Sequence, residues 1–219
     1  MNVYIKQEIK NCEDELSGYV TLFNYRIMNY CVKAELVALL PVTVDFYGSQ
    51  KNLEDVAKIL KPNDYQFEIF PKQKDYLDDI AAGIFDVHPE FKEEVITEDD
   101  ERHLLYTMPE VDKNRRDLLN ETVKTFYNEC KTHLEECRVK YDTLFTENLS
   151  EHPADLDEVK NAISDTYDNI KEQVEKIYQA KRKEIEEGYK RYLEKQEEKQ
   201  AEEAQKFDFT KGMPLNFEE

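Results

Sequence analysis

The sequence predicts an α+β protein, mainly α, in which a long antiparallel three-helix bundle carries a small α/β domain inserted between helices one and two. Three observations predict this fold class. Apolar residues recur at steps of three and four along three long segments, which is the spacing of helices with one buried face. The segment between the first two alternates apolar and polar residues instead. Only 5 Gly and 7 Pro occur in 219 residues, too few for a loop-rich, all-β chain.

The first helix is predicted from a stripe near the beginning of the chain. Its apolar members keep heptad-like steps: Ile5, Ile9, Cys12, Leu16, Tyr19, Phe23, Ile27 and Tyr30. This spacing gives a long helix a single apolar face. We therefore expect residues 1–35 to supply the first helix of the bundle.

The inserted α/β domain is predicted over residues 36–106. Four segments carry its strand and helix signals: VTVDFYG (42–48), YQFEIFP (65–71), QKDYLDDIAAGIF (73–85) and HLLYTMP (103–109). The third has an apolar helical face, and the others alternate or extend like strands. The chain would cross between the domains at Ala34 and Glu35 and again at Met108 and Pro109, and we interpret these four residues as a hinge.

Two further stripes complete the bundle over residues 107–200. The second helix has Leu119, Val123, Phe126, Cys130, Leu134, Cys137, Tyr141 and Leu144, and the third has Leu156, Val159, Ile163, Tyr167, Ile170, Val174, Ile177, Ile185, Tyr189 and Leu193. Asp112 is a suitable N-cap for the second helix, and Pro153 or Asp155 lies near the start of the third. The third stripe weakens around Lys181, where we expect the helix to leave the bundle.

The end of the chain is predicted to be a flexible acidic tail, residues 201–219. We expect helix to about residue 204 and disorder beyond it. Four apolar residues in this region are either a short docking motif or part of an untethered end: Phe207, Phe209, Leu215 and Phe217.

The composition argues against several classes of protein. A net charge of -19 opposes non-specific binding to nucleic acid, which depends on neutralising phosphates, although basic side chains can still gather on one face. The most apolar stretch, AELVALLPVTV (34–44), is interrupted by Pro41 and is too short for a membrane span. No signal peptide is evident, so we expect a cytoplasmic protein without membrane contact.

The sequence contains no pattern that indicates a catalytic site, a metal site or a cofactor. The four histidines, His88, His103, His133 and His152, form no HExxH or paired spacing. Cys130 and Cys137 lie in one helical pattern at a separation of roughly 10 Å, beyond the reach of a disulfide. We expect them, with Cys12 and Cys31, to be small buried apolar residues. A non-enzymatic protein without metal or cofactor is therefore predicted.

Two adjacent arginines at the beginning of the second helix need an explanation. Arg115 and Arg116 lie in MPEVDKNRRDLL (108–119), where positive charge opposes the helix dipole. Either the two side chains are solvated and cost little, or an anion binds there, or they pair with acids near the hinge.

The order of these elements, together with two motifs, resembles the ribosome recycling factor family. The first motif is VTVDFYGSQKNLEDVA, with Tyr47, Gly48, Leu53 and Ala57 at the family's offsets. The second is PEVDKNRR, with Pro109, Val111, Asp112, Arg115 and Arg116 at the positions of the family's Pro-x-Leu-Thr-x-x-Arg-Arg. The resemblance covers residues 1 to about 187, and the tail is an addition.

The resemblance implies that the bundle rests on RNA of the large ribosomal subunit. Six candidate contacts follow from it: Lys33, Arg115, Arg116, Lys131, Arg138 and Lys140. Arginine suits this task because its planar fork binds phosphate in a bidentate manner. The sequence also departs from the family, which has arginines where this chain has Tyr30, Glu135 and Val139 and a glycine at Val32.

Two functions from different classes remain open. In the first, the chain is a monomeric recycling factor that binds the ribosome after termination, and an elongation-factor-type GTPase drives its inserted domain to help split the subunits. In the second, a divergent relative has lost recycling and acts as an acidic interaction or ribosome-regulatory module, for example by binding a basic protein through residues 75–101. An oligomeric coiled coil is disfavoured by the inserted α/β segment.

Overall fold

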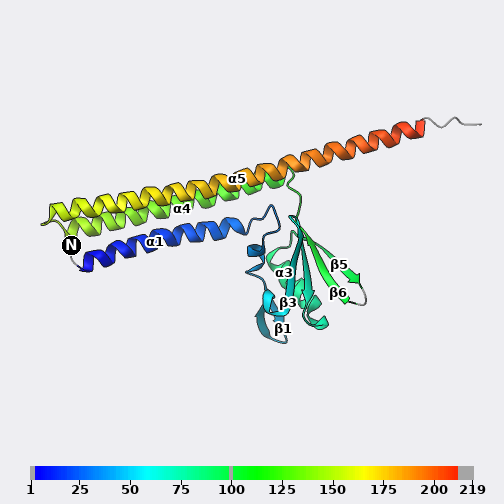
Figure 1. The fold of residues 1–219 in the computed structure, drawn as a ribbon, viewed down its shortest axis with the longest axis horizontal. Helices are drawn as coiled ribbons and strands as arrows, with labels where there is room; N and C mark the ends of the chain where they lie inside the picture. The colour runs from blue at the N-terminus through cyan, green and yellow to red at the C-terminus, as the bar shows by residue number, and fades with distance from the viewer. Residues whose placement is uncertain (1–2, 99–100, 212–219) are drawn as a thin grey trace, which may run out of the picture.

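Three long helices build the main body of the protein in the computed structural model, which describes residues 3–98 and 101–211, with side chains up to residue 204. They are α1 (Val3–Met28), α4 (Lys113–Asn148) and α5 (Pro153–Lys211). Figure 1 shows that the three run along one axis, that α5 continues far past the beginning of α4, and that a small domain is attached where α1 ends. This arrangement confirms the predicted fold class.

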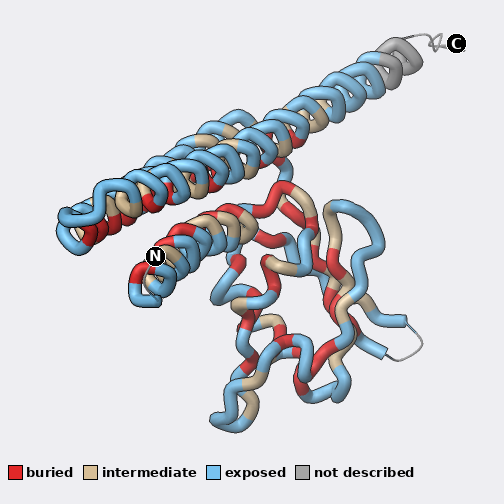
Figure 2. Tube along the Cα trace, turned by 60° about the vertical axis from the view of Figure 1, so that its left-hand side comes forward, coloured by how far each residue is buried: buried red, intermediate tan, exposed pale blue. Residues whose placement is uncertain are grey.

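The predicted apolar stripes form the core of the bundle. Leu16 of α1, Phe145 of α4 and Val174 of α5 are completely buried, and in Figure 2 the buried residues follow the inner faces of the helices. Within the described part of the chain all four cysteines are buried and free. Burial, with Cys137 nearby, raises the pKa of the Cys12 thiol to about 12, so this thiol stays protonated and unreactive at neutral pH.

Helix α4 begins at its predicted cap, whereas α5 stays in the bundle for longer than predicted. Asp112 caps α4 by accepting a hydrogen bond from the backbone N–H of Arg115 at 2.8 Å. The third helix does leave the bundle after Lys181, as predicted (Figure 1), but later than expected, because Lys181 is itself buried, bonds Glu184 at 3.0 Å, and is followed by the completely buried Ile185. The stripe tolerates this lysine because its charge is paired.

The far end of α5 also differs from the expectation. The helix reaches Lys211, later than the end predicted near residue 204. Of the apolar residues considered as a docking motif, Leu215 and Phe217 lie outside the described residues, and the side chains of Phe207 and Phe209 do as well.

The inserted domain combines a hairpin with a four-stranded antiparallel sheet. The hairpin pairs β1 (Thr43–Phe46) with β2 (Ser49–Asn52). The sheet has the order β3-β4-β6-β5, with strands β3 (Ala57–Asn63), β4 (Gln66–Pro71), β6 (Glu101–Thr107) and β5 (Lys92–Glu98). The helical pieces are η1 (Leu36–Leu39), α2 (Leu53–Val56), η2 (Lys74–Tyr76) and α3 (Leu77–Val87). Strands β1, β4 and β6 and helix α3 were predicted, whereas β2, β3 and β5 were not.

The first family-like motif forms a turn and part of a core. Tyr47 and Gly48 both have positive φ, 51° and 77°, and they join β1 to β2 as the two-residue turn that favours glycine. The side chain of Tyr47 is 92% exposed, whereas Leu53 and Ala57 are buried in the core of the inserted domain. The motif therefore fixes the hairpin and anchors the chain that follows it.

Helix α3 approaches β1 closely at Gly83. A Cβ atom at this position would lie 2.4 Å from the backbone oxygen of Thr43, closer than unbonded atoms can approach. Glycine is therefore required for α3 to pack against the hairpin at this distance.

Replacing Gly83 with alanine should lower the free energy of unfolding of the inserted domain by about 1–3 kcal/mol, because the added methyl group pushes α3 away from β1. Gly18→Ala is the matched control. Gly18 is an exposed position in α1 with nothing within 4 Å of a built Cβ, and alanine there should add roughly 0.5–1 kcal/mol of stability. Urea unfolding followed by circular dichroism measures both, and a stabilising effect of Gly83→Ala would contradict the close packing.

Candidate functional site

The face formed by α4 and α5 carries a row of half-buried tyrosines flanked by basic side chains. We call it the α4–α5 seam and define it by the following residues: Arg116, Tyr127, Lys131, Arg138, Tyr167, Lys171, Tyr178, Arg182 and Tyr189. The row follows from the helical repeat, because each tyrosine lies at the edge of the buried stripe, where its ring can be buried while its hydroxyl reaches water.

Each tyrosine ring in the seam lies under a cation. Arg116 lies 4.3 Å from the ring centre of Tyr189, and Arg138 lies 5.3 Å from that of Tyr167. Lys131 lies 5.0 Å from the ring centre of Tyr127. This geometry attracts the cation to the electron-rich face of the ring and holds its charge at the surface.

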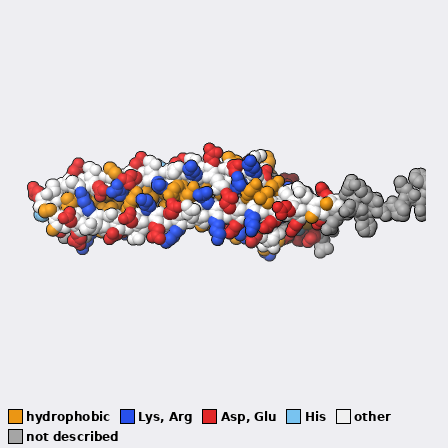
Figure 3. Space-filling view, turned by 90° about the horizontal axis from the view of Figure 1, so that it is seen from above, with side chains coloured by type: hydrophobic (Ala, Val, Ile, Leu, Met, Phe, Trp, Pro, Cys, Tyr) orange, Lys and Arg blue, Asp and Glu red, His pale blue; other side chains and the backbone are white. Residues whose placement is uncertain are grey.

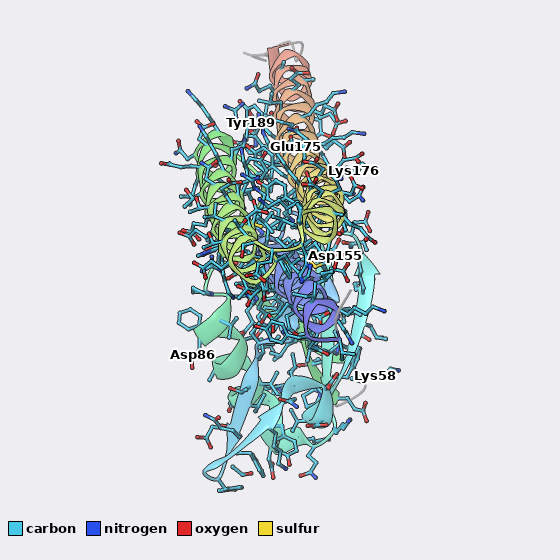
Figure 4. All side chains as sticks on the ribbon, turned by 90° about the vertical axis from the view of Figure 1, so that its left-hand side faces the viewer. Lys58, Asp86, Asp155, Glu175, Lys176 and Tyr189 are labelled. Carbon is cyan, nitrogen blue, oxygen red and sulfur yellow. The ribbon has the colours of Figure 1, made fainter. Side chains whose placement is uncertain are left out.

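The seam faces away from the inserted domain. Figure 4, viewed along the bundle, shows α4 and α5 side by side, with α1 between them and the inserted domain. Figure 3 shows the opposite face of the bundle, where apolar side chains form a strip along the long axis with basic side chains beside it and acidic ones interspersed. A long polyanion could therefore lie along this face without meeting the inserted domain.

Acidic side chains offset much of the positive charge of the seam. Glu135 binds Arg138 at 2.5 Å and also accepts a hydrogen bond from the hydroxyl of Tyr167 at 2.9 Å. The hydrogen bond from Arg138 is the main reason that the pKa of Glu135 is lowered, so this acid stays ionised. Asp117 binds Arg116 at 2.7 Å. Any phosphate that binds the seam must therefore compete with these internal carboxylates.

The structure brings together only some of the residues that the sequence nominated. Arg116, Lys131 and Arg138 share the seam, but Lys140 lies on the other side of α4, where it binds Glu15 of α1 at 2.7 Å. Lys33 is half-buried where the chain leaves the bundle.

Sequence reasoning did not identify the tyrosine row as a feature of the surface. Tyr167 and Tyr189 were assigned to the apolar stripe, and Lys171 and Arg182 were not considered. A signal was present, because within the two helices of the seam a cation follows a tyrosine by four residues three times: Tyr127 and Lys131, Tyr167 and Lys171, Tyr178 and Arg182. Residues four apart are neighbours on a helix surface, so this spacing predicts rings covered by cations.

Arg115 has a different environment from Arg116. Its guanidinium donates a hydrogen bond to the backbone carbonyl of Cys31 at 3.0 Å. Loss of water around it lowers its pKa, while the negative charge of Glu90 acts in the opposite direction. Arg115 thus connects the beginning of α4 to the end of α1, and this role explains one of the two arginines without an external anion.

Arg115 also lies beside a groove of about 710 Å³ between the two domains. The end of α1, the segment after α3 and the first turns of α4 line this elbow groove through Tyr30, His88, Leu118 and other residues. The ring of His88 forms two hydrogen bonds, one with the carbonyl of Ala38 at 2.7 Å and one with the carboxylate of Glu90 at 3.2 Å. These contacts hold the segment after α3 against the inserted domain.

The two chain crossings meet at one turn of the inserted domain. The backbone N–H of Ala34 donates to the carbonyl of Asp64, and that of Met108 donates to the carbonyl of Tyr65, both at 2.8 Å. Ala34 and Met108 are buried in the core of the inserted domain, whereas Val32 and Val111 belong to the core of the bundle. The chain therefore passes from one core to the other at Lys33 and at Pro109–Glu110.

Metal binding and membrane insertion were also considered for the described residues. Across 3–98 and 101–211, no group of three or more His, Cys, Asp and Glu is placed to hold a metal ion. In the same part of the chain, no helix combines the length and the apolar character needed to cross a bilayer.

A three-helix bundle with an α/β domain inserted after its first helix defines a class of elbow-shaped, two-domain proteins, and comparisons place the chain within it. The family model described as ribosome recycling factor matches residues 29–185. The chain belongs to the ribosome recycling factor family. No curated protein shows significant sequence similarity to it.

Solved structures share the fold at low sequence identity. A solution structure of a ribosome recycling factor matches with a TM-score of 0.72 and 17% identity, over 85% of this chain and 100% of that one. A second match is a chain of the models for the T. thermophilus ribosome recycling factor and the E. coli elongation factor G bound to the E. coli post-termination complex. It has a TM-score of 0.56 and 16% identity, over 83% of this chain and 98% of that one.

The two neighbouring arginines should respond differently to substitution. Arg115→Ala should lower the free energy of unfolding by about 1–3 kcal/mol, because it leaves the carbonyl of Cys31 without its donor inside the elbow. Arg116→Ala is the control and should lower the thermal midpoint less, since Arg116 bonds Asp117 and covers the ring of Tyr189 but leaves no backbone carbonyl without a donor. Thermal unfolding followed by circular dichroism compares the two, and equal midpoints would contradict a structural role for Arg115.

Proposed function

We propose that this protein binds the large ribosomal subunit after termination and promotes subunit splitting. The bundle rests on ribosomal RNA through the α4–α5 seam. The inserted domain swings about the two crossings when an elongation-factor-type GTPase pushes it. The action is mechanical: it requires binding and domain motion, and no covalent step.

One observation carries the proposal. Lys131 and Arg138, two positions at which the family resemblance implies contacts to RNA, lie with Arg116 on one long face that the inserted domain leaves open. Membership of the ribosome recycling factor family supports the same function. The pairing of ribosome recycling factor with elongation factor G in the matched post-termination complex supports the GTPase as a partner.

The tyrosines add a second type of contact. Where a ribosomal base or ribose faces the seam, the stacked pair of Tyr127 and Tyr178, whose ring centres lie 4.2 Å apart, offers apolar ring edges between the cations Lys131 and Arg182. Aromatic side chains interleaved with basic ones are typical of surfaces that bind single-stranded or looped RNA. Such contacts depend less on salt than phosphate contacts, which partly offsets the acids in the seam.

Co-sedimentation with large ribosomal subunits across a salt series tests the proposal. We expect saturable binding that weakens as salt is added, because phosphate contacts release counterions. Substituting Lys33, Lys131 and Arg138 together with alanine should reduce the slope of log affinity against log salt by about two to three. An unchanged slope would contradict the role of these three residues. Absence of binding even at low salt would favour the divergent, non-recycling relative.

A gain-of-charge variant provides the control in the opposite direction. Glu135→Arg removes the internal partner of Arg138 and restores a cation where the family has arginine, so it should tighten binding to the large subunit and steepen the salt dependence. Glu136→Arg makes the same change in charge one residue further along α4, at an exposed position. A larger effect at Glu135 than at Glu136 would support a local contact in the seam, and equal effects would indicate only the change in net charge.

A further inference from the structure

Helix α5 continues beyond the part of the chain that the family shares. The family match ends at residue 185, and the matched solution structure is covered completely by 85% of this chain. Helix α5 nevertheless runs on to Lys211. Residues 186–211 lie beyond the family match, and we call them the extension of α5; their first turns pass the two crossings to the inserted domain.

Three residues of the extension meet the elbow, and they lie on one face of α5. At Gly188, a Cβ would come within 2.7 Å of Val32 and 3.0 Å of Val111, so α5 lies directly against both crossings. One turn later, the guanidinium of Arg191 lies 3.5 Å from the ring centre of Tyr65. Lys195 then binds Glu110 at 2.9 Å. Their spacing of three and four residues places all three on the same side of the helix.

The contacted residues determine where the inserted domain can move. Tyr65 lies in the turn of the inserted domain that binds the N–H of Met108, and Glu110 lies in the crossing between the two cores. Arg191 of α5 therefore contacts the inserted domain, and Lys195 of α5 contacts the crossing itself. Loss of water around Arg191 lowers the pKa of its guanidinium, in agreement with its close packing against the ring.

We propose that the extension of α5 is an interdomain latch, in which Arg191 on Tyr65 and Lys195 on Glu110 restrain the inserted domain in one orientation relative to the bundle. The latch is reversible, because Lys195 and Glu110 remain about half exposed, at 50% and 44%, and exposed ion pairs are weak and screened by salt. Its effect on recycling rests on the proposed function, since the GTPase would have to open the latch before the inserted domain could swing. The latch itself is a property of the isolated chain.

Distance measurements between two spin labels on the free, full-length protein test the latch. One label replaces Phe85 in α3, which is 64% exposed, and the other replaces Lys176 in α5, whose side chain is 72% exposed. The native cysteines are buried, so only the two introduced thiols react readily. We expect one narrow distance distribution for the otherwise unaltered chain at low salt, and a broader one at high salt.

The variants isolate the two contacts. Arg191→Ala combined with Lys195→Glu should increase the population outside the main distance by about threefold or more, as expected for the loss of weak, partly exposed contacts. Lys199→Glu repeats the charge change one turn further along α5 at an exposed position and should leave the distribution unchanged.

A charge exchange supplies the decisive comparison. Lys195→Glu alone should broaden the distribution, and adding Glu110→Lys should narrow it again, because the ion pair is rebuilt with reversed sign. Circular dichroism confirms that each variant is folded. The proposal would be overturned if the variant with both Arg191 and Lys195 changed gave the same distance distribution as the unaltered chain. It would also be overturned if the charge exchange did not restore the narrow distribution. Neither result depends on whether the protein binds ribosomes.

Discussion

Two backbone hydrogen bonds to a single turn hold the two ends of the inserted domain together, next to the points where the chain enters and leaves the bundle. Ala34 and Met108 donate to the neighbouring carbonyls of Asp64 and Tyr65, so both ends of the insertion are held at one place. Buried backbone groups need partners, and this turn supplies them for both chain crossings at once. As a result the inserted domain has a single point of attachment, with Lys33 on one side and Pro109–Glu110 on the other. Arg115 of α4 and Arg191 of α5 both contact residues close to that point, Cys31 and Tyr65.

The two long faces of the bundle differ in what lies beside them. The inserted domain lies beside the end of α1, and the α4–α5 seam is a long face that this domain leaves open. On this face Glu135 restrains Arg138, whereas Lys131 lies over Tyr127. Binding of RNA to such a surface must displace carboxylates from cations, and each displacement reduces the gain from counterion release. In the proposed complex, the internal carboxylates would therefore weaken the electrostatic attraction of the seam for RNA, and the aromatic rings would offset part of that loss.

The bundle was predictable because its signal repeats over many turns, and each stripe has a partner stripe. The inserted domain was only half predictable. Strands β3 and β5 form the edges of the sheet, and KEEVITE in β5 is largely exposed, so it lacks the alternation that identifies a half-buried strand. The cap at Asp112 could be predicted from the local sequence. The different roles of Arg115 and Arg116 could not, because the two residues are of the same type and adjacent. Only the path of the chain near Cys31 decides which of them bonds the end of α1.

The central claim is that the α4–α5 seam is the face that meets ribosomal RNA. Photo-crosslinking tests it directly, with p-benzoylphenylalanine in place of Tyr178 in the seam or of Tyr25 on α1, which is 43% exposed. Both substitutions replace one aromatic ring by another, and each protein is irradiated on post-termination ribosomes. We predict crosslinks to large-subunit RNA from position 178 and few or none from position 25. Crosslinks to RNA from position 25, with none from position 178, would contradict the claim.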